Sequence, residues 1–168
     1  MRIGIDIDDT LVCTSESFDE VINKYNINFS KKWNDEWTKE ERDFIFYKYL
    51  DKILLGAKFK ENSIEVINKL YDLGHTIIVI TARSNNYYKG MKEKTLEILD
   101  REGLKISEVY FEQNKKSDLA KKLNIDLMID DSKYVYDNMI NDGIDCILFG
   151  DKIKTWNQVL EYVNEKEE

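Results

Sequence analysis

Four aspartates occur in two pairs, Asp6 with Asp8 and Asp130 with Asp131, and each pair directly follows a short apolar segment. An acidic side chain at the end of a buried strand costs free energy unless it is paired, because a carboxylate loses its hydration there. In an open parallel sheet, ligands bind beyond the carboxyl ends of the strands. Two acidic pairs at that edge therefore predict a site for a hard cation such as Mg²⁺, which prefers oxygen ligands.

Each pair also has a purely structural interpretation. Asp6 and Asp8 are compatible with an Asx turn or a helix cap, and Asp131 or Ser132 with the N-cap of the helix that follows. If the first strand continued, Asp6 and Asp8 would point to the same side. Two carboxylates that face one point repel each other unless a cation or a shared proton intervenes. Taken together, the two pairs favour a metal site.

Two further segments carry groups suited to an anion. Thr81-Ala82-Arg83-Ser84 follows an apolar run, and a hydroxyl beside a helix N-terminus would bind phosphate there, although an ordinary N-cap explains the same residues. Lys115-Lys116-Ser117-Asp118 opens an expected helix, where a lysine can hold a phosphate as a point charge. A solvated run of charges is the alternative. We prefer Lys116 to Lys115 because Lys116-Ser117-Asp118 begins a helix cleanly.

The elements that must position these groups alternate between strand and helix. Short runs rich in Ile, Val, Leu, Phe and Tyr predict five buried strands: Arg2–Asp6, Thr76–Thr81, Glu108–Glu112, Asp126–Asp130 and Asp145–Phe149. Apolar residues at helical spacing predict five helices between and after them: Asn62–Leu73, Tyr87–Glu102, Lys115–Leu123, Lys133–Asn141 and Trp156–Glu165. This order predicts an α/β fold with a Rossmann-like, parallel five-stranded sheet.

About seventy residues separate the first two strands, which is far more than one crossover helix requires. Within them, Glu16–Tyr25 and Thr38–Leu55 have the character of two helices. We therefore predict a helical cap at residues 15–60 over the end of the sheet. Residues 1–14 and 61–168 would form the α/β core.

Composition narrows the classes of function. The chain has 168 residues, of which 42% are hydrophobic, and a net charge of −8, which disfavours binding to a nucleic acid polymer. No apolar run is long enough to span a membrane. Cys13 and Cys146 follow no metal-ligand spacing, and we interpret them as reduced thiols of a cytoplasmic protein. A single histidine, His75, nearly excludes histidine-centred metal or triad chemistry.

The order Asp-x-Asp-x-Thr, Thr, Lys, Asp-Asp resembles the four signature motifs of haloacid dehalogenase-like (HAD) phosphatases, and the resemblance covers essentially the whole chain. It implies that Asp6 is the nucleophile and Asp8 the general acid/base. Thr81 matches the phosphate-binding Thr or Ser of the family, with Ala82 and Arg83 in the same phosphate-binding segment.

The same resemblance makes Lys116 the lysine that balances charge on the phosphate. It implies an Mg²⁺ cofactor and assigns the metal site to four residues: Asp6, Asp8, Asp130 and Asp131. It also implies an aspartyl-phosphate intermediate, and Asp8 would then need a pKa well above the ~3.9 of a free aspartate in order to donate a proton. Asp9 departs from the family, which most often has Gly at this position.

Within the family, the opening Gly-Ile-Asp-Ile-Asp-Asp-Thr and the Ile-Asp-Asp-Ser motif resemble bacterial nucleotidases related to 5′(3′)-deoxyribonucleotidases. This predicts a nucleoside monophosphate as substrate, with Trp33 and Trp37 of the cap as candidates to stack on the base. A sugar phosphate or another small metabolite is the alternative substrate, and a homodimer is compatible with the family. A non-enzymatic receiver domain is a remote alternative, because a receiver has its acidic pair after the first strand and lacks a long cap.

Overall fold

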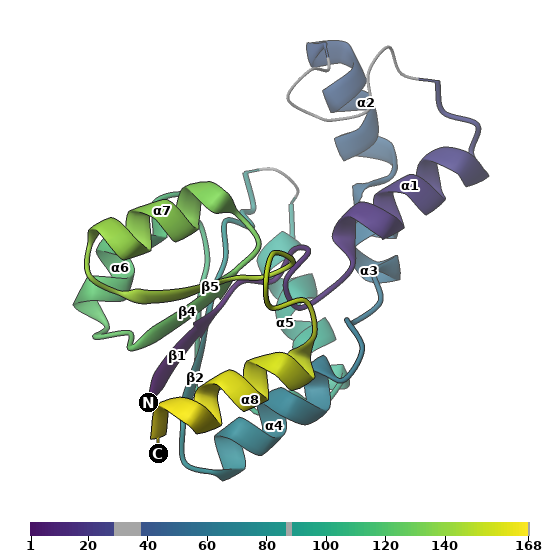
Figure 1. Cartoon of the computed structure of the whole chain (residues 1–168). Coiled ribbons are helices and arrows are strands. Elements are labelled where there is room, and N and C mark those ends of the chain that lie inside the picture. Colours follow the sequence, from purple (N-terminus) through teal and green to yellow (C-terminus); the bar gives the residue numbers. More distant parts are fainter. Residues whose placement is uncertain (29–37, 87–88, 168) are drawn as a thin grey trace.

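Short runs of β-branched and other apolar residues form five parallel strands in the order β3-β2-β1-β4-β5, as a computed structural model shows for residues 1–28, 38–86 and 89–167 (Figure 1). The strands are β1 (Arg2–Ile5), β2 (Thr76–Ile80), β3 (Glu108–Tyr110), β4 (Leu127–Asp130) and β5 (Asp145–Leu148). The predicted fold class is confirmed. All five strands lie where the sequence predicts them, with ends that differ by one or two residues.

Helices cover both faces of this sheet, which explains why its strands are apolar throughout. The core helices are α4 (Ser63–Asp72), α5 (Met91–Arg101), α6 (Lys116–Lys122), α7 (Lys133–Asn141) and α8 (Trp156–Glu167). Residues of α4, α5 and α8 pack in one apolar cluster with Ile3, Ile5 and Ile129. Residues of α6 and α7 pack on the opposite face, in a second cluster that includes Met128.

Alternation along the strands decides which face the acidic residues reach. Gly4 and Met128 belong to the face covered by α6 and α7, and the same alternation carries Asp6 and Asp130 to that face. The approach of β1 to β4 is close, because a Cβ atom at Gly4 would lie 2.7 Å from the Met128 sulfur. A larger residue at this position would therefore require the Met128 side chain to move.

A helical insert follows β1, as predicted. It consists of α1 (Thr14–Lys24), α2 (Lys39–Lys48) and α3 (Leu50–Gly56), which extend outward from the end of the sheet where β1 terminates (Figure 1). The insert has its own apolar cluster, in which Val21 of α1 contacts Ile45, Tyr49 and Ile53. Thr38 begins α2 with a capping box, since its side chain accepts from the Glu41 backbone and the Glu41 side chain accepts in return.

Two predicted helices are wrong in detail. The predicted helix Thr38–Leu55 is broken at Tyr49, where φ is −129° and ψ is −10°. The Tyr49 ring is buried and lies 4.9 Å from the ring of Tyr25, so packing within the insert changes the direction of the chain despite a continuous helical pattern. The helix predicted from Tyr87 begins at Met91, because Gly90 has a left-handed φ of +86° and the Asn85 side chain accepts from the Lys92 backbone.

Candidate active site

The carboxyl ends of β1 and β4 bring two predicted site residues together. The backbone N–H of Asp6 donates to the carbonyl of Ile129 at 3.0 Å, which extends the β1–β4 ladder to the first acidic residue. Asp130 is the last residue of β4 and is 1% exposed. The two carboxylates therefore lie next to each other inside the protein, on the face covered by α6.

The first residue of α6 supplies the cation that these carboxylates need. The Lys116 ammonium lies 2.5 Å from an Asp6 oxygen and 2.7 Å from an Asp130 oxygen, and all three side chains are buried. Burial alone would lower the pKa of Lys116, but the two neighbouring carboxylates raise it, so this side chain carries its charge. Lys115 is exposed and pairs with Asp118 instead, at 3.1 Å. Of the two lysines left open by the sequence, Lys116 is the one in the cluster.

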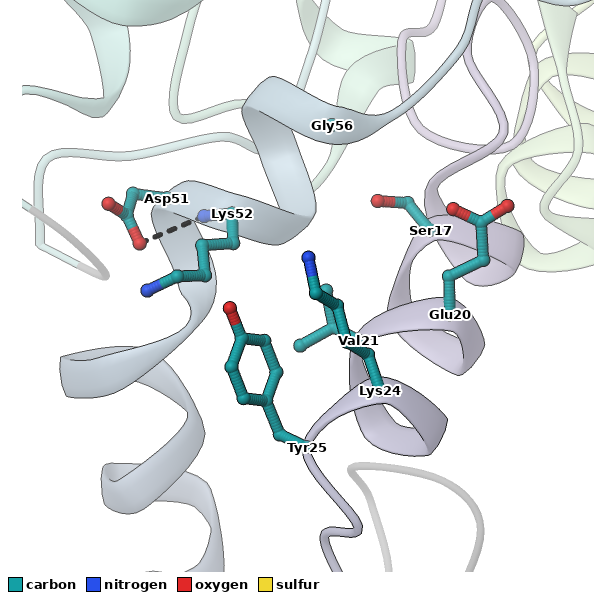
Figure 2. Close-up of a pocket in the computed structure, with 8 residues that line it drawn as sticks. All are labelled: Ser17, Glu20, Val21, Lys24, Tyr25, Asp51, Lys52 and Gly56. Atoms are coloured by element: carbon teal, nitrogen blue, oxygen red, sulfur yellow. Dashed lines mark hydrogen bonds between the residues drawn. The ribbon is translucent and has the colours of Figure 1, made fainter.

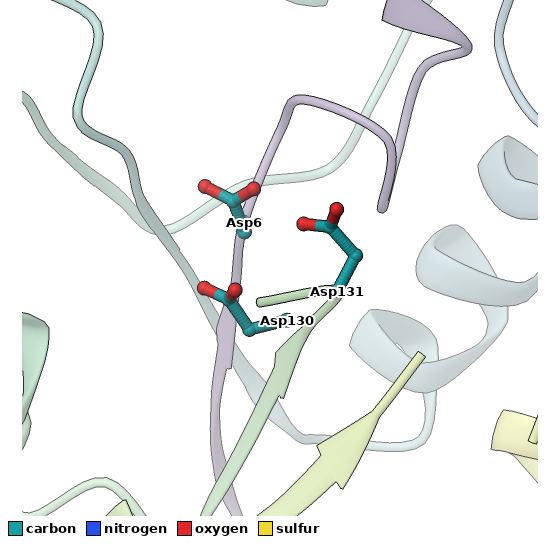
Figure 3. A group of neighbouring side chains, drawn as sticks. All are labelled: Asp6, Asp130 and Asp131. Atoms are coloured by element: carbon teal, nitrogen blue, oxygen red, sulfur yellow. The ribbon is translucent and has the colours of Figure 1, made fainter. Parts of the chain in front are cut away.

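Asp131 completes a group of three carboxylates. Asp6, Asp130 and Asp131 each place one oxygen within 4.8 Å of the others, at the ends of their strands (Figure 3). Desolvation, followed by the charges of Asp130 and Asp9, raises the pKa of Asp131 to about 6. Burial likewise raises the pKa of Asp6, and the contact with the Lys116 ammonium opposes that shift.

Three acidic groups around one ammonium leave an excess of negative charge that a divalent cation would neutralise. An all-oxygen donor set of this kind suits Mg²⁺, which commonly takes one or two carboxylates and keeps several waters. The residues present thus fit the predicted cofactor. Asp130 is also held in place from its other oxygen, which accepts from the Ser132 backbone at 2.9 Å.

Asp8 points away from this group. Its two oxygens accept from the guanidinium of Arg83 at 2.7 and 3.0 Å, and one of them also accepts from the Thr14 hydroxyl at 2.5 Å. Its carboxylate is absent from the group of three found among the described residues.

The pKa of Asp8 is lowered, whereas the sequence predicts a raised one. Burial would raise it, but the charge and hydrogen bonds of Arg83, together with the Thr14 hydroxyl, hold it below the ordinary value. The expectation of a raised pKa was wrong for this arrangement, because the sequence did not reveal that a buried arginine would be the partner of Asp8.

The segment after β2 provides that arginine. Arg83 is buried and also donates to the Thr95 hydroxyl of α5 at 3.1 Å. Thr81 is fully buried, and its hydroxyl oxygen accepts from the Arg83 backbone at 3.2 Å, while Ala82 between them is half-buried. The sequence predicts a helix N-terminus beside Thr81, and this is wrong: no helix starts at residues 81–86, and α5 begins at Met91.

Asp9 stands where the HAD-like motif that the sequence resembles most often has Gly, and its backbone conformation is one that glycine favours. Its φ is +57°, a left-handed conformation that glycine adopts freely and that aspartate tolerates better than most residues. Its carboxylate accepts from the backbone N–H of Ser15 at 2.8 Å and from the Ser15 hydroxyl. Asp9 therefore ties the loop after β1 to the first turn of α1 in the insert.

Several residues of the site escape prediction from the sequence. Trp156 of α8 is fully buried, and its indole N–H donates to the carbonyl of Thr10 at 3.1 Å. This bond anchors the loop after β1 to α8. Thr14, Ser15 and Thr95 hold Asp8, Asp9 and Arg83 as described. Hydroxyl residues directly after an acidic loop are a weak signal for Thr14 and Ser15, whereas no local pattern marks Trp156 or Thr95.

The insert contains a pocket of about 490 Å³ between α1 and α3, lined by Lys24, Tyr25 and Lys52 among others (Figure 2). The ammonium groups of both lysines lie 5.7 Å from the centre of the Tyr25 ring. Trp33 and Trp37, the predicted stacking residues, lie outside the described residues.

Cys13 and Cys146 are both free cysteines. Within residues 1–28, 38–86 and 89–167, no helix combines the length and apolar character needed to cross a lipid bilayer.

No family model and no curated protein matches the sequence. The fold is nevertheless shared with solved HAD structures over nearly the whole chain. A HAD-superfamily hydrolase from Ehrlichia chaffeensis is 13% identical with a TM-score of 0.60, covering 99% of this chain and 97% of its own. A predicted phosphoglycolate phosphatase from Haemophilus somnus is 15% identical with a TM-score of 0.66, covering 96% and 97%.

A third similar structure is D,D-heptose 1,7-bisphosphate phosphatase from B. bronchiseptica, complexed with magnesium and phosphate. It is 11% identical with a TM-score of 0.55, and the match covers 99% of both chains. The TM-scores and coverages establish a HAD-like fold. Identities this low do not identify the reaction, which has to be argued from the site.

The buried charge cluster predicts a specific pattern of stability. Lys116→Met should lower the free energy of unfolding by about 3–5 kcal/mol in Mg²⁺-free buffer, because it leaves Asp6 and Asp130 buried without a cation. Adding Mg²⁺ should recover part of this loss, since a bound cation stabilises the folded state by mass action. Urea denaturation at pH 7 measures both effects. Lys115→Met is the matched control and should change little, and equal losses in the two variants would contradict the cluster's role.

Proposed function

We propose that this protein is a Mg²⁺-dependent phosphomonoester hydrolase in which Asp6 is the nucleophile. The observation that carries the proposal is the buried contact of Lys116 with Asp6 and Asp130, beside Asp131, at the carboxyl end of a parallel sheet. This arrangement combines a nucleophilic carboxylate, a fixed positive charge and an oxygen donor set in one place. Phosphoryl transfer needs these three together, because its transition state spreads negative charge over several oxygens.

In the first step, an Asp6 oxygen forms a bond to phosphorus while the bond from phosphorus to the ester oxygen breaks, giving an aspartyl-phosphate. Water then attacks phosphorus and releases phosphate from Asp6. Lys116 stays beside the reacting carboxylate and offsets the charge of the phosphoryl oxygens. Mg²⁺ held by Asp6, Asp130 and Asp131 would supply further charge neutralisation on those oxygens.

Asp8 would protonate the leaving oxygen and later accept a proton from the attacking water. In the substrate-free arrangement it is instead paired with Arg83 through two hydrogen bonds. A guanidinium binds phosphate with the same two-pronged geometry that it uses for a carboxylate. We infer that the substrate phosphoryl group takes over Arg83, so that Asp8 loses the partner that lowers its pKa, takes up a proton from solvent and can donate this proton to the leaving oxygen. Thr81, whose hydroxyl lies in the same segment, would contact the phosphoryl group as well.

For the leaving group, a nucleoside is our first hypothesis and a sugar or another small metabolite the second. Aromatic residues are dense in the insert, and Tyr25 and Phe44 lie partly exposed beside the buried Tyr49. Rings in this position can stack on a nucleobase, and Trp33 and Trp37 belong to the same insert by sequence.

Replacing the nucleophile tests the core of the proposal. Asp6→Asn should lower kcat/KM for an aryl phosphate by at least about 10³-fold, because an amide cannot form the aspartyl-phosphate. Circular dichroism should show an intact fold, and Asp137→Asn, at an exposed aspartate paired with Lys133, is the matched control. Full activity of the wild type in excess chelator, or retained activity of Asp6→Asn, would refute the assignment.

The role of Asp8 can be separated from that of Asp6 by the leaving group. Asp8→Asn should lower kcat/KM for alkyl phosphates by about 10²–10⁴-fold and for aryl phosphates much less, since a good leaving group needs little protonation. The ratio kcat/KM reports the steps up to aspartyl-phosphate formation, so it isolates the acid function. Thr14→Val removes one hydrogen bond from the same carboxylate and serves as a control for loop geometry. Equal losses on both ester types would argue against Asp8 as the acid.

A substrate comparison tests the nucleoside hypothesis. Stacking on one base is worth roughly 1–3 kcal/mol, so Trp33→Ala or Trp37→Ala should lower kcat/KM for deoxynucleoside monophosphates about five- to a hundredfold. The same variants should leave a small aryl phosphate unaffected. Equal losses on both substrates would mean that the tryptophan stabilises the insert. A wild type that prefers sugar phosphates to every nucleotide would end the nucleoside hypothesis and leave the phosphatase proposal standing.

A further inference from the structure

A second cavity opens beside the candidate active site, on the side of β5. Its volume is about 570 Å³, and Asp9 and Asp131 of the site form part of its wall. The remaining wall includes three lysines, Lys60, Lys133 and Lys154. A molecule bound at the acidic cluster could therefore extend into a space lined by ammonium groups.

Among the described residues, two of these lysines have no acidic partner. Lys133 pairs with Asp137 of its own helix at 2.8 Å. In the part of the chain that the structure describes, neither Lys60 nor Lys154 has a carboxylate within 4.0 Å of its ammonium group. The Lys60 ammonium instead lies 5.7 Å from the centre of the Phe149 ring, which is buried and forms part of the cavity wall.

The wall of this cavity also contains three acidic residues, Asp9, Asp131 and Asp151. The Asp9 carboxylate accepts two hydrogen bonds from Ser15. Asp131 belongs to the group of carboxylates that fits a divalent cation. Hydrogen bonds from neutral donors do not cancel the charge of Asp9, so Asp9 and Asp151 are the acids of the wall that remain beside the lysines. With the cation bound, the ammonium groups of Lys60 and Lys154 share the wall with the carboxylates of Asp9 and Asp151, in a protein whose net charge is −8.

Hydrogen bonds hold the backbones of Lys60 and Lys154 close to the site. The N–H of Lys60 donates to the carbonyl of Leu11, in the loop that follows Asp6, at 2.9 Å. The N–H of Lys154 donates to the Gln158 side chain at 2.8 Å, and the turn before it is closed by the bond from Gly150 N–H to the Ile153 carbonyl at 2.8 Å. These bonds fix the backbone at both positions and so keep the two lysines beside the cavity.

We propose that the preferred substrate carries a second anionic group, a carboxylate or a phosphate, which binds between Lys60 and Lys154 while the reacting phosphoryl group lies at Asp6. This inference rests on the proposed phosphatase function and narrows its substrate class. A nucleoside substrate would then be a bisphosphate, and a small metabolite would be a bisphosphate or a phosphorylated acid. Lys60 and Lys154 select the substrate and take no part in the chemical step.

Binding of inert phosphonates tests this without turnover. Three series with two to five methylene groups are titrated by calorimetry into the full chain with Mg²⁺: alkylphosphonates, ω-carboxyalkylphosphonates and α,ω-alkylene bisphosphonates. At one or more lengths, a member with a second anion should bind about three- to tenfold more tightly than its alkyl partner. Comparison of the two anionic series identifies whether the second group is a carboxylate or a phosphate.

Matched variants locate the effect. Lys60→Gln and Lys154→Gln should each remove most of the advantage of the second anion and leave the affinity for alkylphosphonates unchanged. Lys152→Gln is the control, because Lys152 lies in the same loop as Lys154 and lines a different cavity. If no second anion improves binding at any length, or if the improvement survives in both variants, the inference is wrong and the phosphatase proposal stands. If no phosphonate of any series binds, the proposed phosphate site itself fails, and this inference fails with it.

Discussion

The candidate site depends on one buried ammonium group. Lys116 lies between Asp6 and Asp130, and neither carboxylate could remain ionised inside the protein without a nearby positive charge. The parallel sheet brings β1 and β4 side by side, strand alternation turns both acids to one face, and α6 covers that face with its first residue directed at them. The fold thereby concentrates charge where a phosphoryl group would otherwise find only repulsion.

The loop after β1 distributes its acids among three partners. Asp6 faces the lysine, Asp8 faces Arg83 from the segment after β2, and Asp9 binds the first turn of the insert. From the opposite side, Trp156 holds the carbonyl of Thr10. The position of the insert is thus mechanically linked to the residues that would carry out the reaction, because one short loop is anchored to both.

The surroundings of the site differ in charge from its centre. The centre is acidic and suits a cation, whereas the wall of the cavity toward β5 adds three lysines, two of which have no carboxylate within 4.0 Å among the described residues. A bound cation and these lysines together would attract a polyanionic small molecule to a protein that is acidic as a whole. Under the proposed function, charge on one side and the aromatic insert on the other would select the substrate.

The strands, most core helices and the acidic, threonine and lysine motifs follow from the sequence, because apolar periodicity and short-range spacing act locally. Local pattern favours Lys116 over Lys115, and the structure places Lys116 in the cluster. Local pattern could not pair Asp8 with Arg83, place the Trp156 indole against the Thr10 carbonyl or bend the chain at Tyr49. These outcomes join residues far apart, such as Lys116 and Asp6, which are separated by 110 positions. Only the packed sheet and its helices bring such groups within hydrogen-bond distance, and that proximity decides which charges are paired and which remain free for a ligand.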